Sequence, residues 1–237
     1  MQKVLSPSQI QDRILYQDSS IIVLNKPPHI PVHPGPKGGE NLEDYLPHLQ
    51  FHISQPPALA HRLDRDTAGC LILGRHTKAL KKMGRLFREN SVQKTYWAVL
   101  EGELKDDQGV INLPLSKRSK DKRSWWMKVN KEEGKESITE YEVLGRGDGM
   151  TWVAFYPKTG RTHQLRVHAQ AIGHPIIGDA IYGNGPKHSP VPTLDLLARR
   201  VVFNYQDSKE PIDVAAPPPP HMMGHLEKCG YENDLNI

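Results

Sequence analysis

The chain has 237 residues, which is enough for one large domain or two small ones. A mean hydropathy of −0.58, with 37% hydrophobic and 24% charged residues, excludes the composition of a membrane protein and that of a disordered chain. Its short apolar runs, two cysteines and an N-terminal stretch unlike a signal peptide predict a folded cytoplasmic protein without membrane attachment.

The net charge of +4 is unevenly distributed along the chain. Residues 75–94 carry seven Lys or Arg and one Glu, and residues 116–135 carry eight basic and three acidic residues. A cationic surface concentrated in two segments suits a polyanionic partner, because neutralised phosphates release counterions. Charge alone leaves open the alternative that both runs are solvated faces.

The predicted elements are mostly strands, each an apolar run bounded by Gly, Pro, Asn or Asp. In chain order, these runs are Ile21–Leu24, Leu71–Leu73, Thr95–Leu100, Ile138–Leu144, Thr151–Tyr156 and Arg200–Tyr205.

Two helices interrupt the predicted strands. The first follows Thr77, a candidate N-cap, and combines apolar residues at helical spacing with basic residues on its other faces. The second begins near Thr162 and ends at Gly173, a candidate residue after the C-cap. Strands with a few helices, rather than strict alternation, predict an α+β fold with a largely antiparallel mixed sheet flanked by helices and loops.

The chain shows no low-complexity linker that would divide it, so we expect a single domain over residues 1–220. Residues Pro27–Gly39, rich in Pro and Gly, predict a loop. Residues Ala215–Pro220 predict extended, polyproline-like chain that ends the fold, and residues 221–237 are expected to form a loosely packed C-terminal tail.

Chemically useful side chains gather in two motifs and a strand between them. His61–Gly69 reads HRLDRDTAG, Thr159–His168 reads TGRTHQLRVH, and Lys94–Val99 supplies a tyrosine. Each motif alone is weak evidence for a catalytic site, because an Asp beside an Arg usually forms a surface ion pair and a Tyr in a strand usually belongs to the core.

Together with a third motif, Gly173–Gly183, which reads GHPIIGDAIYG, this combination resembles the RluA family of RNA pseudouridine synthases. The resemblance covers residues 12–216. It implies the pseudouridine synthase catalytic fold and an isomerisation of uridine in RNA that needs no cofactor or metal. In that reaction the N1–C1′ bond breaks, the uracil rotates and a C5–C1′ bond forms.

The resemblance also implies catalytic residues. Asp64 matches the family's catalytic carboxylate, which either adds to the sugar C1′ or removes the C2′ proton, and the sequence does not choose between these routes. Arg166 matches a guanidinium that pairs with Asp64 and favours its ionised form. Tyr96 matches the tyrosine that stacks on the detached uracil and is suited to proton transfer at C5.

The resemblance to the family also implies residues that contact RNA. Arg62 matches the residue that fills the gap left by an extruded uridine, and the alternative for it is an ion pair with Asp66. Weaker candidates for the RNA groove are Lys26, His33, Arg161 and His163.

Other patterns are less informative. We reject a metal site formed by His163, His168 and His174, because their spacing places them on different helix faces. Trp125 and Trp126 suit either stacking on bases or packing on the domain, and this stays open. The family pattern also differs at a few positions that carry no proposed chemistry: Ala68, Ser137 and Leu197.

The sequence thus predicts an RNA pseudouridine synthase acting on a stem-loop of rRNA or tRNA, with phosphate contacts from residues 76–89 and 116–135. Because the resemblance begins near Ile14, we expect no preceding S4 domain, and a monomer is the default. The rival is a non-catalytic RNA-binding or RNA-chaperone module of the same fold. The presence of Asp64, Tyr96 and Arg166 favours the enzyme.

Overall fold

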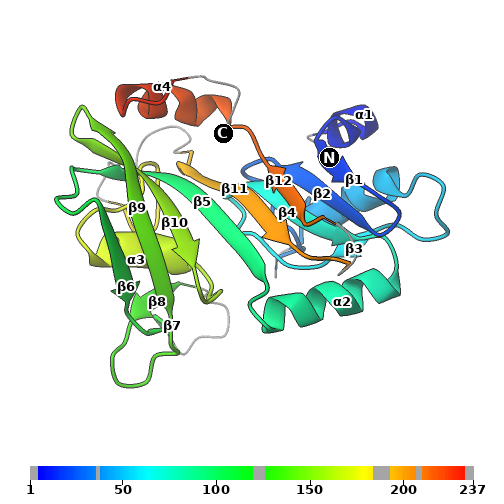
Figure 1. Cartoon of the computed structure of the whole chain (residues 1–237), viewed down its shortest axis with the longest axis horizontal. Coiled ribbons are helices and arrows are strands. Elements are labelled where there is room, and N and C mark those ends of the chain that lie inside the picture. Colours follow the sequence, from blue (N-terminus) through cyan, green and yellow to red (C-terminus); the bar gives the residue numbers. More distant parts are fainter. Residues whose placement is uncertain (1–4, 36–37, 120–125, 184–192, 207–209, 233–237) are drawn as a thin grey trace. The chain divides into compact units, whose positions relative to one another are not determined.

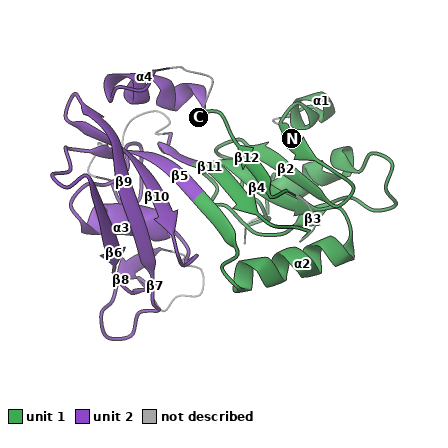
Figure 2. Ribbon diagram, viewed as in Figure 1, with its two compact units in different colours: residues 1–94, 198–217 green, residues 95–197, 218–237 purple. Residues whose placement is uncertain are grey.

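The computed structural model describes residues 5–35, 38–119, 126–183, 193–206 and 210–232. They form two compact units, each assembled from separate parts of the chain (Figure 2). Unit 1 comprises residues 1–94 and 198–217, and unit 2 comprises residues 95–197 and 218–237. The boundaries between the units fall within two strands, β5 (Val92–Glu101) and β11 (Leu196–Phe203), so each strand has residues in both units.

The described residues of unit 1 form antiparallel strands together with α-helices and a 3₁₀ helix (Figure 1). Strand β2 pairs with β1 and β4, β3 pairs with β4, and β12 pairs with β11. The bounds in this unit are α1 (Pro7–Gln11), β1 (Ile14–Gln17), β2 (Ile21–Lys26), the 3₁₀ helix η1 (Leu42–Leu49), β3 (Ala58–Leu59), β4 (Ala68–Gly74), α2 (Thr77–Arg88) and β12 (Ile212–Ala215).

The central strands of unit 1 are apolar on both faces. Residues 21–24 and 71–73 are fully buried, as expected for strands covered on two sides. Helix α2 buries Ala79, Met83 and Leu86 and packs on β4. Its N-cap is His76 and not the expected Thr77, because the His76 Nδ1 accepts the N–H of Ala79 at 3.1 Å.

Unit 2 is built on strand β10, which pairs antiparallel with β5 and β9, while β6 pairs with β9. Strands β7 and β8 form a separate hairpin. The bounds are β6 (Gln108–Asn112), β7 (Leu115–Lys117), β8 (Met127–Val129), β9 (Ile138–Gly147), β10 (Met150–Pro157), α3 (Gln164–Ala171) and α4 (Pro220–Lys228). Helix α3 packs its apolar side into a core formed by Ala98, Leu100, Val153, Phe155, Leu165, Ala169 and Ile176.

The predicted elements are confirmed. Each expected apolar run falls on a strand, although the last strand begins earlier than expected, at Leu196, and ends at Phe203. Both predicted helices are present, and every strand pairing named above is antiparallel. The α+β class is therefore correct. Within the described residues, none of the helices has the length and apolarity needed to span a bilayer.

The prediction of a loosely packed tail is wrong for the described residues 221–232. Helix α4 buries Met222 and Leu226, which lie one turn apart on the same face. A Cβ on Gly145 or Gly147 of β9 would lie 1.9 Å from a carbonyl oxygen at the end of α4, so backbone packs directly on backbone. The tail is thus part of unit 2, and the end of a single catalytic domain at residue 220 stays a prediction.

Candidate active site

Asp64 lies in unit 1, in the loop between β3 and β4. Its side chain is half-buried, while Leu63 and Thr67 beside it are buried. The N–H of Thr67 donates to the carbonyl oxygen of Asp64 at 3.3 Å, which closes a turn over residues 64–67. The carboxylate is therefore carried by a turn that is anchored on both sides.

Lys26, at the end of β2, forms hydrogen bonds with the backbone of this turn. Its side chain is fully buried, and its Nζ donates to the carbonyl oxygens of Pro27, Arg65 and Thr67 at 2.7, 2.9 and 2.9 Å. Burial lowers the pKa of Lys26 to about 7, although the charges of Asp66 and Asp64 oppose that shift. This enclosed amine positions the turn and offers no surface ammonium for the RNA contact expected from the sequence.

His61, three residues before Asp64, has a structural position. Its Nε2 accepts the N–H of Ile72 at 2.9 Å, and its ring lies 4.8 Å from that of Phe87 in α2. Burial, together with the charge of Lys94, lowers the pKa of His61 to about 4. The neutral imidazole thus connects the motif to β4 and α2.

Several other charged residues of unit 1 lie in the Asp64 turn or form short contacts with one another. Asp66 lies 3.3 Å from His29 and 3.7 Å from Arg65, and within the described part of unit 1 it forms no ion pair with Arg62. The ion-pair alternative for Arg62 is therefore not realised, and its side chain is exposed. His33, also exposed, lies 3.1 Å from the carboxylate of Glu43.

The second motif forms the start of α3 in unit 2, as the sequence predicted for Arg166. The Gln164 amide donates to Ile138 and Thr139, and the His168 ring bonds to Thr139 and to the carbonyl oxygen of Leu113. Burial lowers the pKa of His168. These two side chains fasten the helix to β9 and therefore serve packing.

Arg166 forms a buried ion pair with Asp179. Its Nε and Nη2 donate to the two carboxylate oxygens at 2.7 Å each, and the side chains are 3% and 0% exposed. Burial by itself raises the pKa of Asp179, but the hydrogen bonds and charge of Arg166, helped by the N–H groups of Ile181 and Tyr182, bring it below the ordinary value. Both partners are thus charged and fixed in orientation.

Tyr182 connects this pair to its surroundings. Its hydroxyl lies 2.9 Å from the Nδ1 of His163 and accepts the N–H of Met127 at 2.9 Å, at the start of β8. The Arg166 guanidinium lies 5.3 Å from its ring centroid. Asp179 and Tyr182 were not singled out from the sequence, although both stand in the third motif, GDAIYG, to which no role was given.

Other predicted residues of unit 2 take simpler positions. Tyr96 on β5 stands opposite Phe155, half-buried against the core, and Arg161 is exposed with its Nε donating to the carbonyl oxygen of Glu136 at 3.1 Å. His163 is buried and has a left-handed backbone with φ of 52°. Trp126 is 44% exposed, and the guanidinium of Arg118 lies 5.8 Å from its ring centroid. Trp125 lies outside the described residues.

The structure therefore assembles two groups of predicted residues, one in each unit. Asp64 lies with Lys26 in unit 1, and Arg166 lies with His163 in unit 2. The predicted pairing of Asp64 with Arg166 joins the two units and stays a prediction. Among the residues that the structure describes, no three His, Cys, Asp or Glu side chains are grouped as metal ligands.

Comparison with known proteins decides the family. The model of the family described as RNA pseudouridylate synthase matches residues 20–171, which include the Asp64 turn, Tyr96 and the start of α3. This chain belongs to that family. As an RNA pseudouridine synthase, the protein is an isomerase.

Similar proteins agree with this family. A protein described as an uncharacterized RNA pseudouridine synthase of Zymomonas mobilis is 41% identical, over 87% of this chain and 94% of its own. The dual-specificity RNA pseudouridine synthase RluA of Yersinia pestis is 37% identical over 84% and 95%. The solved structure of human RNA pseudouridylate synthase domain containing 4 superposes with a TM-score of 0.78 at 26% identity, covering 95% of this synthase and 96% of that chain. The resemblance to the RluA family is thus confirmed.

Proposed function

We propose that this RNA pseudouridine synthase isomerises specific uridines in a stem-loop of rRNA or tRNA, with Asp64 as the catalytic carboxylate. The observation that carries this proposal is the Asp64 turn itself. The carboxylate is half-exposed, while the backbone of its turn accepts two hydrogen bonds from the buried Lys26 side chain, at Arg65 and Thr67, and Thr67 itself is buried. A rigid backbone below an accessible carboxylate is what attack on a bound nucleotide requires.

The carboxylate of Asp64 can act by either route. It adds to C1′ as the N1–C1′ bond breaks, or it removes the C2′ proton as the uracil leaves with the bonding electrons. The uracil then rotates and C5 forms the new bond to C1′. In the first route the Asp64–C1′ bond breaks in this step and releases the carboxylate, and in the second route Asp64 returns the proton to C2′. The hydrogen on C5 is lost and N1 gains one, so uridine and pseudouridine have the same composition.

Arg166 has a positioning role in this proposal. Asp179 engages its Nε and Nη2, which fixes the plane of the guanidinium. A guanidinium so fixed can pair with Asp64 and favour the carboxylate over the acid. Arg166→Met would then reduce turnover, whereas unchanged turnover with unchanged RNA binding would exclude this pairing.

Tyr96 is proposed to stack on the detached uracil and to move the proton at C5. Its half-buried position on β5 supports a fixed ring. Tyr96→Phe separates the two roles, because it keeps the ring and removes the hydroxyl. Full turnover of this variant would exclude proton transfer by Tyr96.

Arg62, Arg161, His163 and His33 are proposed to contact RNA. Arg62 is free of Asp66 and suited to fill the gap of the extruded uridine. Arg161, His163 and His33 remain candidates for the groove, although His163 is buried against Tyr182. We assign Lys26 to positioning of the turn instead of to RNA contact.

The decisive experiment measures tritium release from RNA labelled with 5-³H-uridine. Asp64→Asn should abolish release while RNA binding and the circular dichroism spectrum are retained. Asp66→Asn is the matched control, because it removes a charge two residues away, from a carboxylate that contacts His29 and Arg65, and should retain release. Normal release by Asp64→Asn would refute the assignment.

The substrate is proposed from the same reasoning and from the relatives. The Yersinia relative is named a dual-specificity synthase, which suits a stem-loop found in more than one RNA. Mapping of pseudouridines in cellular RNA with and without the gene would identify the site. No release from any RNA pool would favour the non-catalytic RNA-binding or chaperone module. The monomeric state and the cytoplasmic location stay predictions.

A further inference from the structure

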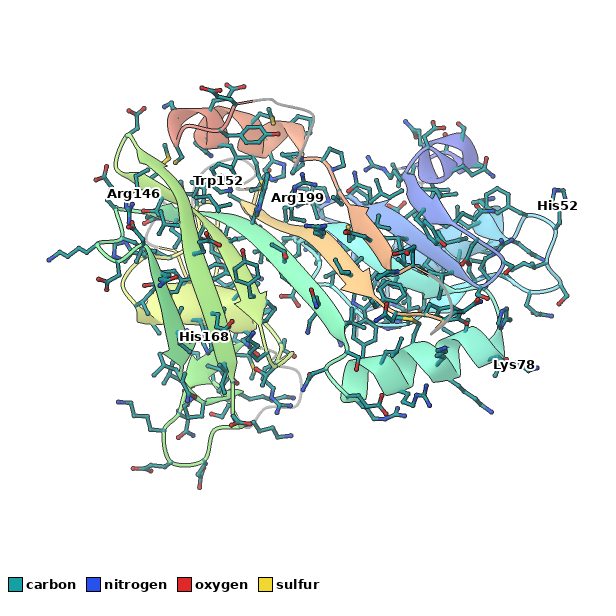
Figure 3. All side chains as sticks on the ribbon, in the orientation of Figure 1. His52, Lys78, Arg146, Trp152, His168 and Arg199 are labelled. Carbon is teal, nitrogen blue, oxygen red and sulfur yellow. The ribbon has the colours of Figure 1, made fainter. Side chains whose placement is uncertain are left out.

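Helix α2 carries a continuous cationic face. At 3.6 residues per turn, its five basic residues fall within about a third of the helix circumference, opposite the buried apolar residues. Figure 3 shows one of them, Lys78, extending outward from the helix. The α2 cationic face consists of Lys78, Lys81, Lys82, Arg85 and Arg88.

This arrangement works against the stability of the helix. Lys78 and Lys82 are four residues apart, as are Lys81 and Arg85, and like charges at this spacing are destabilising. Lys78 also lies in the first turn, where the helix dipole disfavours a cation and no acidic residue is present. The dipole favours Arg85 and Arg88, which lie in the last turn. Helix stability therefore explains these two arginines but not the three lysines.

Few of these charges are neutralised within the protein. Arg85 lies 3.9 Å from Glu89, and Lys82 lies 5.0 Å from the ring centroid of Tyr205. Lys78, Lys81 and Arg88 have no ion-pair partner among the described residues, and all three are exposed. A face of this kind has the charge complementary to a chain of phosphates.

The face belongs to the same unit as the proposed catalytic carboxylate. Phe87, on the buried side of α2, contacts the ring of His61, three residues before Asp64. Residues 78 to 88 span about 15 Å along the helix axis, enough to meet several phosphates of one strand. RNA bound to this face would therefore lie at a fixed position relative to Asp64.

We propose that the α2 cationic face binds the phosphate backbone of the substrate RNA, in the same unit as the proposed catalytic carboxylate. The contact carries charge and no base readout, so it adds affinity and alignment without sequence preference. This inference rests on the proposed function for the identity of the RNA, but it concerns binding and not the chemical step.

The test uses the triple variant Lys78→Gln, Lys81→Gln and Arg88→Gln, which spares the contacts of the other two cations. The dissociation constant for substrate RNA is measured over a range of salt, with tritium release at saturating RNA. The slope of log K against log salt should decrease by about two to three, at roughly 0.7–0.9 per lost phosphate contact. Release at saturating RNA should stay within about twofold of the parent.

A control removes the same net charge elsewhere, on exposed lysines of unit 2: Lys105→Gln, Lys158→Gln and Lys228→Gln, of which Lys158 pairs with Glu140 and Lys228 with Asp148. Its salt slope should match that of the parent. An equal loss in both triple variants would show that net charge, not this face, sets affinity, and would overturn the proposal. Because like charges are removed from α2, the urea midpoint of the α2 variant should not fall, so weaker binding cannot be assigned to unfolding.

The two proposals fail in different ways. If the parent protein binds RNA through α2 but releases no tritium from any RNA, the proposed function fails and the binding face stands. If release is normal and the α2 variant keeps the parent salt slope, only the binding face is refuted. If the parent protein binds anionic phosphatidylserine vesicles, and the α2 triple variant loses that binding but binds RNA as the parent does, RNA is not the partner of this face.

Discussion

Replacing Asp179 by Asn tests how much the buried pair with Arg166 contributes to the fold. The substitution keeps the size of the side chain and removes its charge, so an N–H donor or a neutral oxygen faces the guanidinium. Arg166, 3% exposed, is then left as a buried cation without its counter-charge. Breaking a buried pair from one side costs about 3–5 kcal/mol.

The chain offers a matched control at the surface. Arg200 and Asp213 form the same two-pronged pair, but their side chains are 51% and 42% exposed. An exposed pair contributes only about 0–1 kcal/mol, because water replaces the lost partner. Asp213→Asn should therefore cost several kcal/mol less than Asp179→Asn, although the hydrogen-bond geometry is alike.

Urea denaturation followed by circular dichroism measures both variants. At neutral pH the Asp179→Asn midpoint should fall well below that of Asp213→Asn, and the double variant Arg166→Met, Asp179→Leu should lose less than the sum of its parts. Because Arg166 holds the pKa of Asp179 below the ordinary value, this stability is present above the ordinary carboxyl pKa. It is lost as pH falls through the depressed pKa. Equal costs for the two Asn variants would refute the reasoning from burial.

Three further predictions concern other contacts. Burial lowers the pKa of Lys26 from 10.5 to about 7, so between pH 7 and 10.5 the unfolded chain binds more protons than the folded one, and the free energy of unfolding should rise with pH. Urea titrations of Lys26→Met should lack this rise, and the same pH dependence in both proteins would contradict the prediction. Gly145→Ala should cost on the order of 2 kcal/mol, because its Cβ would meet the C-cap carbonyl oxygen of α4 at 1.9 Å, while Gly160→Ala, with open space, should be neutral in the same titration. Tyr182→Phe should speed hydrogen exchange at the first amide of β8 about tenfold, and the surface control Tyr156→Phe should not; equal rates would exclude the hydroxyl as acceptor.

The catalytic motifs illustrate how far sequence reasoning reaches. The motifs His61–Gly69, Thr159–His168 and Gly173–Gly183 together indicated the family, which the comparisons confirmed. The sequence analysis paired Arg166 only with Asp64, and that pairing stays a prediction. It did not identify Asp179, which forms a buried ion pair with Arg166. No local pattern marks a carboxylate 13 residues away as a partner, and only the folded backbone shows that Asp179 meets the guanidinium.

The sequence by itself determined the strands β2, β4, β5, β9, β10 and β11, the helices α2 and α3, and the α+β class, because apolar periodicity and end signals act over a few residues. Tertiary structure decided the rest. Lys26 is an ordinary surface residue type, and it is buried only because carbonyl groups from residues 39 and 41 positions later surround its amine. Helix α4 is too short to be stable alone, and it exists because glycines in β9 let its backbone approach. Such contacts depend on which distant segments meet, and no local pattern encodes that.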